Sequence, residues 1–167
     1  MATYAHQDAL VSTDWLNDHL HHPSIRIVEV IWGSQAAYGY QSYSSGHIPG
    51  AVALDYEKHY GEARGKIIDQ VEYENELSRA GITTDTTVVV YSAVNNLLAT
   101  FEFWLMKYYG HEDVRLLDGD REKWLVEKRP LEQTIPSYPQ TRYQAKAPNE
   151  SLRSNRTDVS RAIGNKS

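Results

Sequence analysis

The alternation of short aliphatic runs with helix-like stretches is the feature of this sequence that most limits its fold. The runs are rich in β-branched residues and nearly continuous in apolar character, as expected for strands that are covered on both faces of a parallel sheet. Strand–helix–strand order of this kind implies right-handed crossovers. The sequence therefore predicts an α/β domain with a parallel sheet of about five strands and helices on both faces. Four of the strands are expected at residues 25–31, 51–54, 87–91 and 114–117.

The stretches between these runs carry recognisable helix ends. Capping residues mark the starts, and Gly81 and Gly110 are placed to end two helices in the left-handed conformation. Trp15, Leu16 and Leu20 form an apolar stripe on the first helix. Four helices are therefore expected: from Ser12 or Thr13 to about His21, from Asp69 to Gly81, from about Asn95 to Tyr109, and from Asp120 to Glu127.

The composition changes after residue 130. Four prolines within about 20 residues, separated by Ser, Thr and Gln, are typical of an extended strap or linker. Residues 151–163 could begin a helix, but nothing follows for it to pack against. We expect one domain over residues 1–147 and a linker over residues 148–167.

Charge and cysteine content exclude several classes of function. The net charge is -5 without a basic block, so neither nucleic acid nor a membrane is an expected partner. No window approaches the roughly 18 consecutive apolar residues of a membrane span, and the first eight residues do not resemble a secretion signal. The absence of cysteine excludes disulfides, thiolate nucleophiles and cysteine–metal sites, and it fits a reducing compartment. We expect a cytoplasmic protein with no metal and no cofactor.

The loop after the strand at residues 87–91 occupies the most favourable position for a site. In a parallel sheet, ligands bind beyond the carboxyl ends of the strands, where helix amino-termini present N–H groups. This loop comprises Ser92, Ala93, Val94, Asn95, Asn96 and Leu97. It contains no cysteine, no cation and no phosphate-binding glycine pattern, so its position suits a site but its residues do not supply chemistry.

Two further motifs have ordinary structural interpretations. Gly46-His47-Ile48-Pro49-Gly50-Ala51 predicts a tight turn that leads into a strand. Leu116-Leu117-Asp118-Gly119 predicts a strand end and a turn, followed by a helix whose Trp124 faces the core. Taken alone, a single histidine or an Asp-Gly turn more often has a structural role than a catalytic one.

The three motifs in this order and spacing resemble the rhodanese family. The resemblance extends to Val11–Leu16, to Gly81–Tyr91, to Phe103–His111 and to the segment from Trp124 through Leu131. Over about residues 8–150 the chain is similar to the amino-terminal domain of two-domain thiosulfate sulfurtransferases. That resemblance implies a three-layer rhodanese-like fold. The tail from Glu150 to Val159 looks like the segment that leads into the second domain of such proteins.

The resemblance also implies that this half does not perform the chemistry. In the family, a Cys thiolate of the second domain takes sulfane sulfur from thiosulfate and passes it to cyanide or another thiophile. Here Ser92 stands at the cysteine position and Leu97 about where a loop arginine would be. Asn95 and Asn96 agree with a non-catalytic half. Two departures are the stretch Ile31–Ser34 in place of an acidic one, and Asp120 in place of a second glycine.

We therefore expect the amino-terminal, cleft-forming half of a thiosulfate:cyanide sulfurtransferase. Its partner would be a catalytic second rhodanese domain of the same parent protein, with Trp32, Tyr38 and Tyr40 as candidate cleft or interface residues. Self-association of the isolated half is possible through exposed interface surface. The main alternative is a stand-alone, inactive rhodanese-like binding or regulatory module. A third hypothesis makes Ser92 the nucleophile of a hydrolase, with His47 or His111 as its base.

Overall fold

A five-stranded parallel sheet forms the centre of the molecule in the computed structural model, which describes residues 7–33, 40–60 and 66–163. The strand order is β1-β5-β4-β2-β3, and every neighbouring pair is parallel. The prediction of an α/β fold with a parallel sheet is confirmed. The strands are β1 (Leu10–Val11), β2 (Ile25–Ile31), β3 (Val52–Asp55), β4 (Thr87–Tyr91) and β5 (Val114–Leu117).

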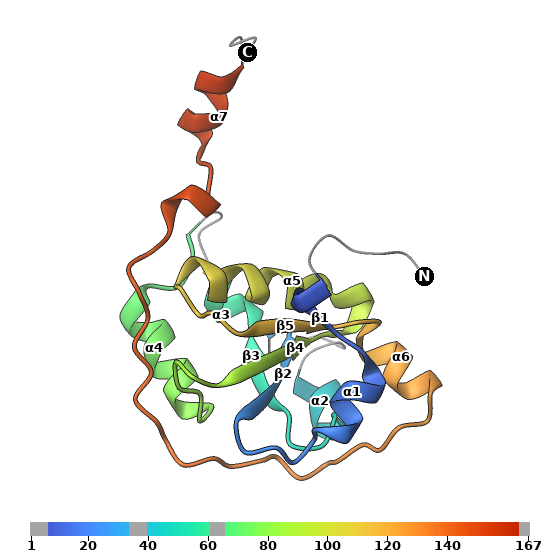
Figure 1. The fold of residues 1–167 in the computed structure, drawn as a ribbon. Helices are drawn as coiled ribbons and strands as arrows, with labels where there is room; N and C mark the ends of the chain where they lie inside the picture. The colour runs from blue at the N-terminus through green and yellow to red at the C-terminus, as the bar shows by residue number, and fades with distance from the viewer. Residues whose placement is uncertain (1–6, 34–39, 61–65, 164–167) are drawn as a thin grey trace.

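Helices cover both faces of this sheet, which gives three layers (Figure 1). One face is packed by α1 (Thr13–Asp18), α2 (Tyr40–Ser45) and α6 (Asp120–Val126). The other face is packed by α3 (Tyr56–Tyr60), α4 (Gln70–Arg79) and α5 (Ala93–Tyr108). Alternate side chains of the central strands divide between two cores. On β4, Val88 and Val90 join the α4/α5 core, whereas Val89 and Tyr91 join the α1/α6 core.

The register of β2 against β4 brings their carboxyl ends together. Ile25 lies opposite Thr87, and the pairing continues to Glu29 opposite Tyr91. Both strands are buried along nearly their whole length. An acidic residue and a tyrosine are therefore placed side by side beneath the loop that follows β4.

Several short elements differ from the sequence-based expectations. The first helix ends at Asp18 rather than at about His21, because a turn follows it. Strand β1 and helices α2 and α3 were not predicted, since β1 has two residues and each helix has five or six. Segments this short have no measurable periodicity, and their conformations depend on the neighbours that they contact.

The segment after α6 crosses the surface of the domain as an extended strap (Figure 1). Its Glu132 pairs with His47 through backbone hydrogen bonds. Farther along the strap, Lys146 N–H donates to the carbonyl of Tyr109, just after α5, at 3.0 Å. It ends in η2 (Glu150–Leu152) and α7 (Arg156–Ala162). Helix α7 extends away from the domain, and all of its residues are exposed. Within the described ranges, no helix combines the length and the apolar character that crossing a membrane requires.

Candidate functional site

The loop that follows β4 has an unusual backbone. Ser92 is fully buried and extended, with φ of -151° and ψ of 174°. The next turn, at the start of α5, places Val94, Asn95 and Asn96 in the left-handed region, with φ of 57°, 55° and 58°. The helix expected from about Asn95 therefore becomes regular only after Asn96. A left-handed conformation is costly for a β-branched residue such as Val94, so surrounding contacts must hold the loop in place.

Acceptors from the chain itself hold this loop. The N–H of Ser92 donates to Asn96 Oδ1 at 2.9 Å, and the N–H of Asn95 donates to Asp120 Oδ2 at 2.8 Å. The amide of Asn96 is fixed in turn, since its Nδ2 donates to Leu117 O at 2.7 Å. Backbone N–H groups in a turn of this kind could bind an anion, but these two are already bonded to side-chain oxygens. The loop has the position of an anion cradle, and residues of the chain fill it.

The hydroxyl of Ser92 is also engaged locally. Its Oγ accepts a hydrogen bond from the N–H of Ala99 at 3.2 Å and donates to Ala93 O at 3.2 Å. Neither contact involves a base that could remove the hydroxyl proton. Ser92 therefore acts as a structural link between β4 and α5.

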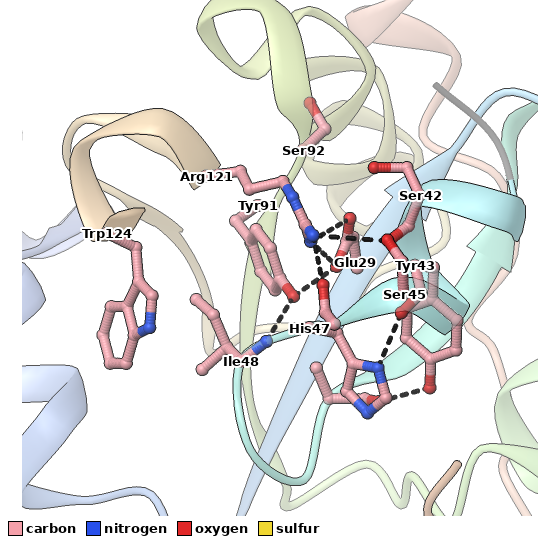
Figure 2. A network of polar contacts seen from close by, with 12 residues as sticks. Glu29, Ser42, Tyr43, Ser45, His47, Ile48, Tyr91, Ser92, Arg121 and Trp124 are labelled. Carbon is pink, nitrogen blue, oxygen red and sulfur yellow. Dashed lines mark hydrogen bonds and ion pairs between the residues drawn. The ribbon is translucent and has the colours of Figure 1, made fainter. Parts of the chain in front are cut away.

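A buried ion pair lies beneath the loop (Figure 2). Arg121 from α6 places its Nη1 2.9 Å from both carboxylate oxygens of Glu29 on β2. The hydroxyl of Tyr91 donates to Glu29 Oε2 at 2.5 Å. Burial raises the pKa of Glu29, and the charge of Arg121 and the bond from Tyr91 oppose that rise. The three side chains join β2, β4 and α6 at the carboxyl end of the sheet.

The Gly46–Ala51 turn is attached to the same network. Arg121 Nη2 donates to the carbonyl of Gly46 and, at 3.3 Å, to that of Ser42. The N–H of Ile48 donates to the hydroxyl of Tyr91 at 3.1 Å. His47 is fully buried, stacks on Tyr43 at 4.1 Å between ring centroids, and has its Nδ1 2.9 Å from Tyr43 O.

Gly50, after His47, positions the strap and the following strand. Pro49 lies in the turn itself, and the N–H of Gly50 donates to Glu132 Oε2 at 3.0 Å. Gly50 has a φ of 77°, which favours glycine at this position. The motif thus builds a turn that contacts both the sheet and the strap.

The turn between β5 and α6 explains why an aspartate can replace a second glycine. Gly119 has a φ of 105° and Asp120 a φ of 60°, so two successive residues lie in the positive-φ region. Aspartate tolerates this region better than most residues. Its Oδ1 also accepts from the N–H of Glu122 at 2.7 Å and of Lys123 at 3.2 Å, which caps α6. The carboxylate of Asp120 therefore caps one helix and binds the loop of another.

The structure does not bring Ser92 together with either candidate base. In Figure 2, the imidazole of His47 lies on the far side of the Glu29–Arg121 pair from Ser92 and contacts Tyr43 instead. His111 lies at the opposite end of β4, where its Nε2 is 3.0 Å from Thr86 O and its Nδ1 is 3.1 Å from the hydroxyl of Tyr143. Extended chain from Thr86 to Ser92 separates the two ends by about 20 Å. The hydrolase hypothesis is therefore wrong.

The three candidate cleft residues, Trp32, Tyr38 and Tyr40, lie in different surroundings or outside the described residues. Trp32 follows β2, is 43% exposed and donates from its Nε1 to Glu57 Oε1 at 2.9 Å. Tyr38 lies outside the described residues. Tyr40, expected in a long loop, instead begins helix α2. Beside the β4 loop, Val94 and Leu97 are exposed apolar residues that the sequence analysis did not propose as surface contacts.

Sequence reasoning missed the charged residues of the network. Glu29 falls within the strand expected at residues 25–31, and Arg121 within the helix expected from Asp120 to Glu127, and neither was proposed for a site. A charged residue inside an otherwise apolar strand was the available signal. A second buried group was also missed: His59 Nδ1 lies 2.6 Å from Glu102 Oε2, and the hydroxyl of Tyr73 donates to Glu102 Oε1 at 2.7 Å. The described residues include no group of three or more His, Cys, Asp or Glu side chains placed to bind a metal.

Comparison with known proteins decides the family of this chain. A family model described as the rhodanese-like domain matches residues 12–127. This chain belongs to the rhodanese family. The chain is 43% identical over 157 residues to "Sulfur carrier protein TtuD" of Thermus thermophilus. The alignment covers 93% of this chain and 53% of that protein. The chain is 42% identical over 163 residues to a "Putative thiosulfate sulfurtransferase" of Mycolicibacterium smegmatis, covering 97% of the chain and 57% of that protein.

The solved structures agree with the fold of the rhodanese-like domain. The crystal structure of SseA from Escherichia coli, one of the 3-mercaptopyruvate sulfotransferases, superposes with a TM-score of 0.82 at 28% sequence identity. The match covers 94% of this chain and 62% of that chain. YnjE superposes with a TM-score of 0.76 at 26% identity, covering 90% of this chain and 38% of that one. The rhodanese-like domain thus spans about half the length of the curated relatives that it matches.

Proposed function

We propose that this rhodanese-like domain is the amino-terminal, non-catalytic half of a cytoplasmic thiosulfate:cyanide sulfurtransferase. Its function would be to pack against a second rhodanese domain that carries the reactive cysteine and to wall one side of the active-site cleft. The coverage of about half of each curated relative is consistent with a protein of two such halves.

One observation carries this proposal. The loop where the family places its nucleophile contains Ser92, and the hydroxyl of Ser92 and the nearby amides are bonded within the chain. Sulfur transfer requires a thiolate that attacks the sulfane sulfur of thiosulfate, releases sulfite and holds a persulfide. A serine hydroxyl does not form that carrier, so this loop supports a structural role.

A steady-state assay of thiocyanate formation from thiosulfate and cyanide tests the proposal. We expect the 167-residue chain alone to give the buffer rate. A fusion is then made by joining, after Ser167, the part of the M. smegmatis relative that this chain does not match. We expect this fusion to turn over thiosulfate and cyanide. Turnover by the 167-residue chain itself would contradict the account of the loop. A fusion no more active than its added half alone would favour the stand-alone binding module.

A further inference from the structure

Helix α5 has apolar surface on two sides, and only one of them is covered by the sheet. Its inner side packs Leu98, Ala99, Leu105 and Met106 into the core. Its 16 residues include only two charged ones, Glu102 and Lys107, and Glu102 is fully buried. A helix that is apolar on all sides is normally buried on all sides. The composition of α5 therefore fits a helix that has packing partners on both sides.

The outer side of α5 carries an aromatic row that continues onto neighbouring elements. We define this aromatic row as Trp32, Tyr56, Phe101 and Trp104. The ring centroids of Trp32 and Tyr56 are 5.2 Å apart, those of Tyr56 and Phe101 5.0 Å, and those of Phe101 and Trp104 5.7 Å. Trp32 is exposed and the other three are partly exposed. Leu97, 62% exposed on the same helix, extends the apolar surface to the β4 loop.

The carboxyl-terminal segment leaves the domain beside this row. The Nε1 of Trp104 donates to Leu152 O at 2.9 Å, and the hydroxyl of Tyr108 donates to Glu150 Oε1 at 2.7 Å. Beyond these contacts, α7 extends past α5 into solvent (Figure 1), with Val159 and Ile163 exposed. The segment to which a second domain would be joined therefore leaves this domain beside the aromatic row.

We propose that the aromatic row and Leu97 are the surface on which a second rhodanese domain docks. This inference rests on the proposed function and adds to it the surface that meets the catalytic half. Aromatic side chains are the usual anchors of such interfaces, because they bury large apolar areas with little loss of rotamer freedom. The row also runs from the contact of Trp104 with Leu152 to Trp32 after β2, so the docked domain would cover the outer side of α5 and the carboxyl end of β2.

Site-specific alkylation tests the docking surface, since the chain has no cysteine of its own. Thr100 is exposed on α5, between Leu97 and the aromatic row, so Thr100→Cys places one thiol on the proposed surface. Val126→Cys is the matched control, because Val126 is a β-branched helical residue, 80% exposed, on the opposite face of the sheet. Alkylation rates by iodoacetamide are compared between the 167-residue chain and the two-domain fusion described above, with peptides resolved by mass spectrometry.

We expect the Thr100→Cys thiol to react at least tenfold more slowly in the fusion and the Val126→Cys thiol to react within twofold in both proteins. Equal rates at Thr100→Cys in an active fusion would overturn the docking surface and leave the proposed function standing. Equal rates in a fusion that also lacks added activity would overturn both. Slow, concentration-dependent labelling of Thr100→Cys in the 167-residue chain would show that a second copy covers the row, and would overturn the assignment to a catalytic domain.

Discussion

At the scale of single residues, hydrogen bonds within the chain hold the loop after β4 in its left-handed conformation. Ser92 forms hydrogen bonds with neighbouring backbone, and Asn96 and Asp120 supply the acceptors that the turn needs. Buried N–H groups without partners are costly, so a loop that binds no ligand must be satisfied from within the chain. We infer that Asp120 and Asn96 stabilise the left-handed shape of this loop.

Substitutions at Asp120 separate the hydrogen bonds of its carboxylate from the strain of its left-handed backbone. Asp120→Ala removes the cap and the loop acceptor and keeps a Cβ at a φ of 60°. We expect a loss of about 2–3 kcal/mol in the free energy of unfolding, measured with urea. Asp120→Gly loses the same bonds but relieves the backbone, and should be about 1 kcal/mol more stable than Asp120→Ala. Equal stability of the two variants would show that the left-handed conformation is not strained.

The Glu29–Arg121 pair gives a pH-dependent prediction. Arg121→Met leaves a buried carboxylate without its cation and should cost about 3–5 kcal/mol near pH 8. Burial raises the pKa of Glu29 even in the parent protein. A raised folded-state pKa favours the native state at low pH, and that contribution is lost as the pH rises through the folded-state value. Thermal unfolding of Arg121→Met should therefore occur at a higher temperature at pH 5 than at pH 8, and the double variant with Glu29→Gln should lose that dependence.

At the scale of elements, the strap is fixed by side chains far apart in the sequence. Arg26 on β2 lies with its guanidinium 3.2 Å from the centre of the Tyr138 ring, and the hydroxyl of Tyr138 donates to Gly50 O at 2.8 Å. Arg26 is 9% exposed, and its Nη2 donates to Gly81 O at 3.3 Å. The strap thereby joins β2 and the turn after α4 to the turn after His47.

Substitutions at Tyr138 test how firmly the strap is held. Tyr138→Ala removes the ring from a largely desolvated cation and should cost about 2 kcal/mol or more. Limited proteolysis should then cut the strap faster than in the parent protein. Tyr138→Phe keeps the ring and loses only the hydroxyl, so it should cost about 1 kcal/mol. A Tyr138→Ala strap that resists protease as well as the parent would show that other contacts hold it.

A second element-level prediction concerns α3, which is joined to α5 by the buried pair of His59 and Glu102. Burial lowers the pKa of His59, but the charge of Glu102 and its hydrogen bond outweigh burial and raise it, with smaller contributions from Glu76 and Asp55. Because the folded-state pKa is raised, this contribution is present at low pH and is lost as the pH rises above the usual histidine range. The melting temperature should fall over that interval. Glu102→Gln should reduce this fall of the melting temperature with pH. An unchanged fall in that variant would show that other titrating groups cause it.

At the scale of the whole molecule, a single substitution should not restore catalysis. Ser92→Cys adds a thiol, but Leu97 supplies no cation and the loop amides remain bonded to Asn96 and Asp120. We expect thiocyanate formation by this variant to stay at the buffer rate. A triple variant with Leu97→Arg and Asp120→Gly should be the first with measurable thiosulfate binding. Robust turnover by Ser92→Cys alone would show that the loop needs no added charge.

Long elements were predictable because their signals are local. Strands β2, β4 and β5 are runs of β-branched and aliphatic residues, and α4 begins at the expected cap, Asp69. Strand β1 was not predictable, since two residues become a strand only by pairing with β5. The left-handed turn at Val94–Asn96 was missed for a related reason: Asp120 stabilises the turn from 25 positions away, although asparagine tolerates this conformation better than most residues.

The sequence by itself determined the order of the longer elements, the parallel sheet and the absence of a thiolate, because each depends on residue type and local spacing. Tertiary structure alone decided how the loop after β4 is held. Register places Glu29 beside Tyr91, the β5–α6 turn delivers Asp120 and Arg121 beneath the loop, and α5 keeps an apolar outer side. Contacts between residues distant in the chain depend on how the layers pack, and no local pattern encodes that packing.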